Sequence, residues 1–235
     1  MKREYFKWYS PALNREMELL AFGHAGQNML AFPTSKGRFF DWEGFGMIDA
    51  LAWAIDRGWV QVICVDSVDA ESWYNYSVPP WRRILRHEQY DAYVRNEVVP
   101  FVVHRSGNPY IATAGCSFGG YHAANFAFRH PDVIRKVVAM SGMFDIKPML
   151  DGYYDDHVYY NNPLDYLPGL SNSWYLDAMR QQKVFLGASP HEPYLDQYYR
   201  LADLLGQKGV PYRLDIPPDA THDWPFWRWY VNQCL

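Results

Sequence analysis

Hydrophobic residues along this chain form short continuous runs that alternate with amphipathic stretches. Val60–Val65 is an apolar run rich in β-branched residues, interrupted only by Gln61, which is typical of a strand buried on both faces. Gly46–Arg57 instead repeats its apolar residues at helical spacing, and Gly58 follows it. The pattern therefore predicts a buried strand that follows directly after a helix.

The same reasoning extends along the chain. Glu16–Gly23 and Asn28–Phe32 flank a glycine-containing turn and are predicted to pair as an antiparallel hairpin. Further strands are expected at Tyr110–Ala114, Val137–Met140, Val184–Ala188 and Tyr212–Ile216. Further helices are expected at His87–Val103, Phe118–Arg129, Leu195–Gln207 and Trp224–Cys234. Strands that alternate with helices after a hairpin predict an α/β fold with a mostly parallel central sheet and helices on both faces, a three-layer sandwich.

Residues 146–177 interrupt this alternation. The segment is rich in Tyr, Asp, Asn and Pro, and it is too long for a plain connection between elements. The chain has 235 residues, which fits one domain of about 200–250 residues better than two. We therefore predict a single domain over residues 1–235, with a lid-like insertion at about 146–177.

The charge balance argues against a polyanionic partner. The formal net charge is −4, and no long basic run occurs, so the electrostatic footprint of nucleic-acid binding is missing. No window approaches the roughly 18 apolar residues of a membrane span, and the N-terminus lacks the apolar stretch of a secretory signal. Three cysteines without framework spacing (Cys64, Cys116 and Cys234) predict free thiols and a cytoplasmic location.

One motif carries candidate chemistry. Gly115–Gly120 reads G-C-S-F-G-G, a G-x-S-x-G match between a predicted strand and a predicted helix. Such a match alone is weak, but a serine at a sharp strand-to-helix turn needs small flanking residues so that the neighbouring elements can pass closely. The context therefore predicts Ser117 as a nucleophile. Cys116 is expected to face the core instead.

A serine hydroxyl needs a base to take its proton. In a fold of this kind the base comes last in chain order, on a loop after the final strand, and His222 occupies that place. Two other histidines fit less well, because His122 falls within the helix behind the serine and His24 lies in the early hairpin. His222 is the predicted base.

A third catalytic residue beside the serine and the histidine should be a carboxylate that fixes the tautomer of the imidazole. It is expected on the loop after Val184–Ala188, where Glu192 is favoured over Asp196 because Asp196 falls in the next predicted helix. The remaining alternatives are Asp145, Asp219 and Asp223. Donors for an oxyanion are expected from the backbone N–H of Phe118 and from the loop at Pro33–Gly37, through Ser35 or Thr34.

The loop Asp66–Trp73 follows a predicted strand at the carboxyl edge, where ligands of open α/β sheets bind. Trp73 is a candidate lining residue of a substrate pocket, and the high aromatic content of 18% allows an aromatic-walled one. The three acids of the loop have no His or Cys beside them, so they are expected to be solvated acids and not a metal site.

Together these segments resemble the esterase group of the α/β-hydrolases that is related to esterase D and the antigen 85 acyltransferases. The similarity rests on four segments and runs nearly end to end: Phe32–Gly37, Val65–Trp73, Gly115–Gly119 and His222–Pro225. It implies the α/β-hydrolase fold and hydrolysis of carboxylic esters by Ser117, His222 and an acid, without a cofactor. Relatives use either Glu or Asp as the acid, and the segment before Glu192 lacks the common Gly-x-x-Asp pattern, so the acid stays open.

The expected function is that of a serine esterase which hydrolyses a small-molecule ester through an acyl-enzyme intermediate. Two alternatives remain: an acyltransferase that uses the same triad, and a binding protein on a hydrolase scaffold that has lost catalysis. The sequence indicates neither the physiological ester nor the oligomeric state.

Overall fold

A computed structural model describes all residues, 1–235. Its centre is an eight-stranded sheet with the order β1-β2-β4-β3-β5-β6-β7-β8. The strands are β1 (Arg3–Ser10), β2 (Arg15–Phe22), β3 (Gln27–Phe32), β4 (Val60–Val65), β5 (Ile111–Cys116), β6 (Ile134–Met140), β7 (Lys183–Gly187) and β8 (Tyr212–Asp215). β1 and β2 are antiparallel to each other, β2 is antiparallel to β4, and all other neighbours are parallel. The predicted mostly parallel sheet is confirmed.

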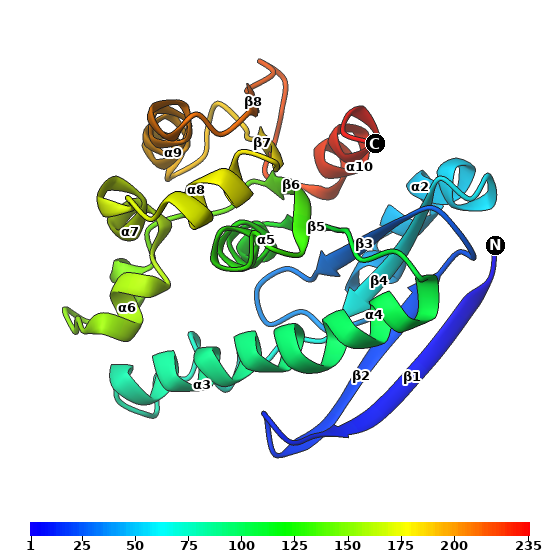
Figure 1. The fold of residues 1–235 in the computed structure, drawn as a ribbon, viewed down its shortest axis with the longest axis horizontal. Coiled ribbons are helices and arrows are strands. Elements are labelled where there is room, and N and C mark those ends of the chain that lie inside the picture. Colours follow the sequence, from blue (N-terminus) through cyan, green and yellow to red (C-terminus); the bar gives the residue numbers. More distant parts are fainter.

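Helices cover both faces of the sheet (Figure 1). The α-helices are α1 (Asp41–Gly44), α2 (Met47–Asp56), α3 (Pro80–Tyr93), α4 (Val99–Ser106), α5 (Phe118–Arg129), α6 (Asp156–Tyr160), α7 (Pro163–Gly169), α8 (Ser173–Met179), α9 (Leu195–Lys208) and α10 (Trp224–Gln233). One apolar core joins the sheet to α3, α4, α5 and α9, and a second joins its other face to α1, α2 and α10. This is the α/β-hydrolase fold that the sequence predicts.

The two cores follow from the alternation of side chains along the strands. Successive residues of a strand point to opposite faces, so a strand covered on both sides must be apolar throughout. In β4, Ile63 packs in the core with α3–α5, while Val62 and Cys64 pack in the core with α2 and α10. All six residues of β4 are buried, and the one polar residue among them, Gln61, accepts a hydrogen bond from Arg105.

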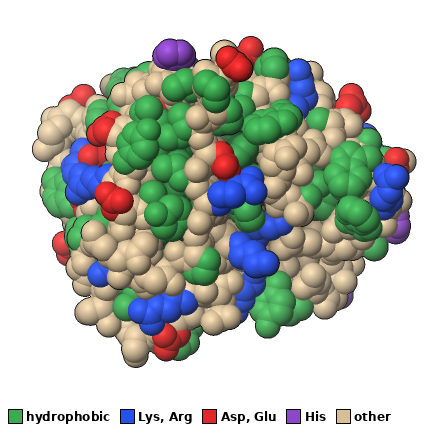
Figure 2. All heavy atoms as spheres, turned by 90° about the horizontal axis from the view of Figure 1, so that it is seen from above, with side chains coloured by type: hydrophobic (Ala, Val, Ile, Leu, Met, Phe, Trp, Pro, Cys, Tyr) green, Lys and Arg blue, Asp and Glu red, His purple; other side chains and the backbone are tan.

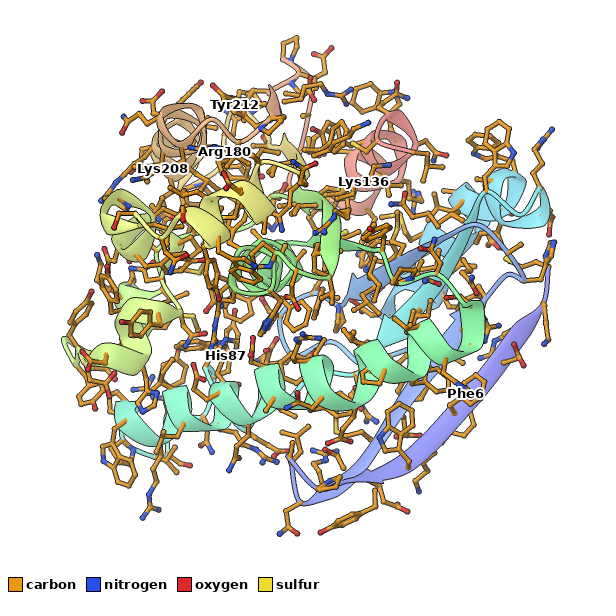
Figure 3. The ribbon with its side chains drawn as sticks, in the orientation of Figure 1. Phe6, His87, Lys136, Arg180, Lys208 and Tyr212 are labelled. Atoms are coloured by element: carbon orange, nitrogen blue, oxygen red, sulfur yellow. The ribbon has the colours of Figure 1, made fainter.

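The predicted hairpin of Glu16–Gly23 with Asn28–Phe32 is wrong. β2 pairs with β1, and β4 lies between β2 and β3. β1 was not expected because polar residues alternate along it, which leaves a half-exposed strand at the edge of the sheet. Its inner face still contributes aromatic packing. Phe6 lies between β1 and α4 (Figure 3), and its ring centroid is 4.9 Å from that of Phe101.

The predicted helix at His87–Val103 is longer than expected. It begins at Pro80. Proline suits the first position of a helix because it has no N–H that would lack an acceptor there. The helix continues through a π-helical turn at Val94–Val98 to Ser106. None of the helices is long and apolar enough to cross a membrane.

Residues 146–177 fold into short helical pieces, a 3₁₀ turn at Lys147–Met149 followed by α6, α7 and most of α8. The segment is tied to the rest of the molecule by buried side chains. Arg83 of α3 donates to the carbonyl of Met149 at 2.5 Å, and Tyr121 of α5 donates to the carbonyl of Asn161 at 2.9 Å. The prediction that this segment acts as a lid stays a prediction.

The surface mixes side-chain types. Figure 2 looks onto the side formed by α9, β8 and α10, where hydrophobic side chains lie between Lys, Arg, Asp and Glu. Large exposed apolar groups on these elements include Tyr199, Tyr212 and Trp229. All three cysteines are buried free thiols, as the sequence predicts.

Candidate active site

Ser117 lies at the turn between β5 and α5. β5 ends at Cys116 and α5 begins at Phe118, so Ser117 is the single residue that connects them. Its backbone has φ 54° and ψ −125°, a conformation that L-residues rarely adopt and that costs free energy. A strained turn of this kind lifts a side chain above the carboxyl end of the sheet.

The glycines around Ser117 allow this turn to form. A Cβ on Gly115 would lie 1.9 Å from the carbonyl oxygen of Gly119, so no larger residue fits there. A Cβ on Gly119 would lie 2.4 Å from the carbonyl oxygen of Pro33. Because both positions exclude a methyl group, β5, α5 and the loop after β3 approach one another closely.

His222 lies on the loop between β8 and α10. Its Nε2 is 3.0 Å from Oγ of Ser117, within hydrogen-bonding distance. The ring of Trp227 meets the imidazole edge-on with centroids 5.3 Å apart, and the Trp227 indole N–H donates to Oγ of Ser141 at 2.9 Å. α10 therefore fixes the position of the imidazole.

Glu192 follows β7 and contacts the other nitrogen of the same ring. Its Oε2 is 2.6 Å from Nδ1 of His222, and its side chain is 4% exposed. Burial raises the pKa of Glu192, but hydrogen bonds from His222 and Ser141 outweigh burial and leave the pKa below its usual value. The carboxyl group is therefore ionised at neutral pH.

The other candidate residues lie elsewhere. Asp196 is exposed in the first turn of α9, and Asp219 is exposed in its loop. Asp145 accepts from Asn162, and Asp223 caps α10 by accepting from the N–H of Trp224 at 2.7 Å. His24 is exposed, and His122 pairs with Asp69. The structure thus brings together Ser117, His222 and Glu192 and none of the alternatives.

Of the three N–H groups expected to hold an oxyanion, two have no acceptor in the structure and one has. Phe118 is the first residue of α5, so its N–H has no acceptor within the helix. Ser35 lines the same cavity as Ser117, and its N–H donates to no group. The prediction for Thr34 is wrong, because its N–H donates to Oδ2 of Asp41 at 2.9 Å and is therefore occupied.

A cavity of about 540 Å³ opens beside Ser117. Its lining is formed by polar groups around the serine and by aromatic and sulfur-containing side chains: Ser35, Tyr74, Tyr76, Ser117, Phe118, Ser141, Gly142, Met143, Pro148, Met149, Glu192, Pro193, Tyr194 and His222. An apolar wall with a few convergent polar groups is typical of a small-molecule site. Pro148 and Met149 belong to the inserted segment.

Trp73 does not line this cavity, so that prediction is wrong. Its side chain is fully buried and packs against His87 and Tyr121, with ring centroids 4.9 and 5.9 Å away. The next residue, Tyr74, faces the cavity and donates to Oγ of Ser35 at 2.8 Å. The aromatic residues of this segment do indicate the cavity, but Trp73 and Tyr74 are adjacent in one turn and their side chains point to different sides.

Two of the three acids of the same loop are buried, contrary to expectation, whereas the side chain of Glu71 is 38% exposed. Asp66 and Asp69 are each 1% exposed. Asp66 accepts from Nε of Arg38 at 2.8 Å, and Asp69 lies 2.8 Å from Nε2 of His122. Burial raises the pKa of Asp66 although Arg38 opposes it. Nowhere in the chain are three or more His, Cys, Asp or Glu side chains grouped so that they could hold a metal ion.

Comparisons with known proteins identify the family and the fold of the chain. A family model described as "Putative esterase" matches residues 60–233. Among curated proteins, no sequence matches the chain. A ferulic acid esterase structure aligns with a TM-score of 0.79 at 18% identity, covering 100% of this chain and 96% of its own.

Two further structures show the same fold. An S-formylglutathione hydrolase from Agrobacterium tumefaciens aligns with a TM-score of 0.76 at 14% identity, covering 98% of this chain and 92% of its own. Mycobacterium tuberculosis MPT51 aligns with a TM-score of 0.68 at 16% identity, covering 99% and 96%. The family match spans most of the chain, from β4 to α10. The chain belongs to this esterase family and is an ester-hydrolysing enzyme with the α/β-hydrolase fold.

Proposed function

We propose that the protein is a serine esterase in which Ser117 is the nucleophile, His222 the general base and Glu192 the acid that orients the base. One observation carries the proposal: a continuous chain of contacts, 3.0 Å from Ser117 Oγ to His222 Nε2 and 2.6 Å from His222 Nδ1 to Glu192 Oε2. A nucleophile bonded to a base that is in turn held by a third group is the arrangement by which a hydroxyl is activated.

The first half of the reaction forms an acyl-enzyme. His222 takes the proton of the Ser117 hydroxyl as Oγ attacks the ester carbonyl, and the resulting oxyanion is held by the N–H groups of Phe118 and Ser35. The C–O bond to the alcohol then breaks, and His222 gives its proton to the leaving alkoxide. Glu192 stabilises the imidazolium without taking a proton, which agrees with its lowered pKa.

The second half repeats these steps with water. His222 takes a proton from water as the water oxygen attacks the acyl carbonyl, and the proton returns to Oγ as the acid leaves. The cavity volume of about 540 Å³ supports a small-molecule ester as substrate. Glu192 is the only carboxylate that lines it and is bound to His222, and no Lys or Arg lines it, so an uncharged ester fits best.

The proposal is tested with a short acyl ester of p-nitrophenol. We expect the wild-type protein to release p-nitrophenolate and Ser117→Ala to reduce kcat by about 10⁴-fold or more, while circular dichroism and the melting temperature stay the same. A fluorophosphonate probe should label the wild-type protein and not Ser117→Ala. Undiminished turnover by Ser117→Ala would refute the assignment.

The two alternative functions give different results in the same assay. A binding protein without catalysis would neither turn over the ester nor react with the probe. An acyltransferase would transfer the acyl group to an added alcohol in preference to water, which product analysis with competing acceptors detects.

A further inference from the structure

The loop that carries Ser35 is fixed from both sides by carboxylates. The N–H of Thr34 donates to Oδ2 of Asp41 at 2.9 Å, and the N–H of Lys36 donates to Oδ2 of Asp69 at 3.2 Å. Of three consecutive backbone N–H groups, only the middle one, of Ser35, has no acceptor. The two flanking bonds therefore leave a single donor of this loop free beside the cavity.

Asp69 uses its second oxygen to contact the nucleophile helix. Oδ1 lies 2.8 Å from Nε2 of His122, which is five residues beyond Ser117 in α5. The side chains of Asp69 and His122 are 1% and 2% exposed. The His122 ring also meets the ring of Phe118 edge-on, with centroids 5.0 Å apart. One carboxylate thus connects the loop of Ser35 to the helix that begins with Phe118.

We propose that Asp69 is a positioning residue that sets the distance between the two oxyanion donors, the N–H groups of Ser35 and Phe118, by binding Lys36 with one oxygen and His122 with the other. Asp41 holds the opposite side of the same loop through Thr34. The proposal rests on the proposed function, because it assigns Asp69 a role in stabilising the oxyanion of that reaction. Preorganised donors accelerate a reaction only when they already lie where charge will develop.

The chemistry of the contacts explains why a carboxylate is needed at this position. Both oxygens of Asp69 face a hydrogen-bond donor. Asparagine has one acceptor oxygen. If that oxygen accepts from Lys36, the NH₂ group faces Nε2 of His122, which can accept only if the ring proton moves to Nδ1, where no hydrogen-bond partner lies. At Asp41 both contacts, from the N–H and the hydroxyl of Thr34, fall on Oδ2 alone. The single amide oxygen of asparagine can accept both of these bonds. Replacement by asparagine is therefore expected to disturb the site at Asp69 but not at Asp41.

The first test compares Asp69→Asn with Asp66→Asn in the p-nitrophenyl ester assay. Asp66 is the matched control because it is equally buried on the same loop but binds Arg38 and the N–H of Phe39. We expect Asp69→Asn to lower kcat by about 10- to 100-fold, less than or equal to the loss of one oxyanion donor, with KM nearly constant. Asp66→Asn should lower the melting temperature but keep kcat. Equal losses of kcat in the two variants would overturn the proposal.

A second readout separates positioning from general loosening. A trifluoromethyl ketone forms a hemiketal oxyanion with Ser117, whereas the matching methyl ketone binds mainly without that charge. In Asp69→Asn the inhibition constant of the fluorinated compound should rise by the same factor by which kcat/KM falls, and that of the methyl ketone should stay constant. A parallel rise for both compounds would contradict the role of Asp69.

If Asp69→Asn does not fold, variants of Asp41, which holds the opposite side of the loop, provide the test. Asp41→Ala removes both contacts to Thr34, while Asp41→Asn can keep them. We expect a larger fall in kcat for Asp41→Ala than for Asp41→Asn, and equal effects would overturn the proposal. Failure of the proposed function is distinguishable, because the wild-type protein would then show no turnover or Ser117→Ala would retain it.

Discussion

Cys116 precedes the proposed nucleophile, yet its thiol is unsuited to replace the hydroxyl. Its side chain is fully buried in the core with α2 and α10, and burial raises the pKa of the thiol well above its usual value. A thiol that stays protonated and out of contact with solvent is a poor nucleophile. The adjacent residue points to the opposite side, into the cavity.

We therefore predict that thiol reagents do not inhibit the enzyme. Burial likewise raises the pKa of Cys64, and Cys234 is 1% exposed. Incubation of the folded protein with iodoacetamide should leave esterase activity unchanged, and mass spectrometry should find the three thiols alkylated only in denaturant. Loss of activity together with modification of Cys116 would contradict this prediction.

At the scale of single residues, the sequence predicted best where chain order constrains the chemistry. The sequence could predict that Ser117, His222 and Glu192 meet, because each follows a strand that ends at the same edge of the sheet. Trp73 could not be distinguished from Tyr74, since the side to which each residue of a short turn points depends on packing against α3 and α5. The burial of Asp69 was likewise invisible, because its partner His122 is more than fifty residues away.

At the scale of elements, α5 and the loop after β3 approach each other closely beside the site. A Cβ on Gly119 would lie 2.4 Å from the carbonyl oxygen of Pro33 and 2.6 Å from that of Phe32. These atoms are backbone and cannot rotate away, so either α5 or the loop must move. The loop carries Ser35, whose N–H is a proposed oxyanion donor.

We predict that Gly119→Ala lowers kcat by about 10-fold or more through displacement of a donor and lowers the free energy of unfolding by about 1–3 kcal/mol through overpacking. Gly44→Ala is the matched control, because nothing lies within 4 Å of an added Cβ there. Kinetics and urea denaturation of both variants test this. Wild-type activity in Gly119→Ala would show that the loop can shift without cost to the reaction.

Which strands pair was harder to predict than where the strands and helices lie in the sequence. β4, α2 and α5 lie within one residue of their predicted ranges, because continuous apolar runs and helical spacing are local signals. The residues near β2 do not by themselves determine that β2 pairs with β1. It depends on β3 entering the sheet between β4 and β5, where both of its faces become covered, and on β1 closing the edge that remains.

At the scale of the whole molecule, buried carboxylates make stability depend on pH. Burial raises the pKa of Asp91, but His130 and Arg129 outweigh burial and leave it below the usual 3.8, as happens for Glu192 relative to 4.5. A group whose folded pKa is lowered binds its proton more readily in the unfolded chain. Its contribution to stability is therefore present above the unfolded pKa and is lost as pH falls through the folded value.

We predict that the free energy of unfolding is nearly constant above about pH 5 and falls steadily below about pH 4. The free energy of unfolding of Glu192→Gln should be lower than that of the wild-type protein at pH 7, and this difference should shrink as the pH falls. Urea denaturation at several pH values measures both. A difference that grows toward low pH would contradict the expected sign of the effect.

The proposed base, His222, lies 105 residues beyond Ser117 in the chain, on the loop that α10 holds in place. During synthesis on the ribosome, the strand-to-helix turn of Ser117 can therefore form long before any imidazole reaches it. Without the segment that carries His222, the hydroxyl of Ser117 has no base to take its proton. On the proposed mechanism, a chain that has not yet packed α10 is therefore inert toward esters.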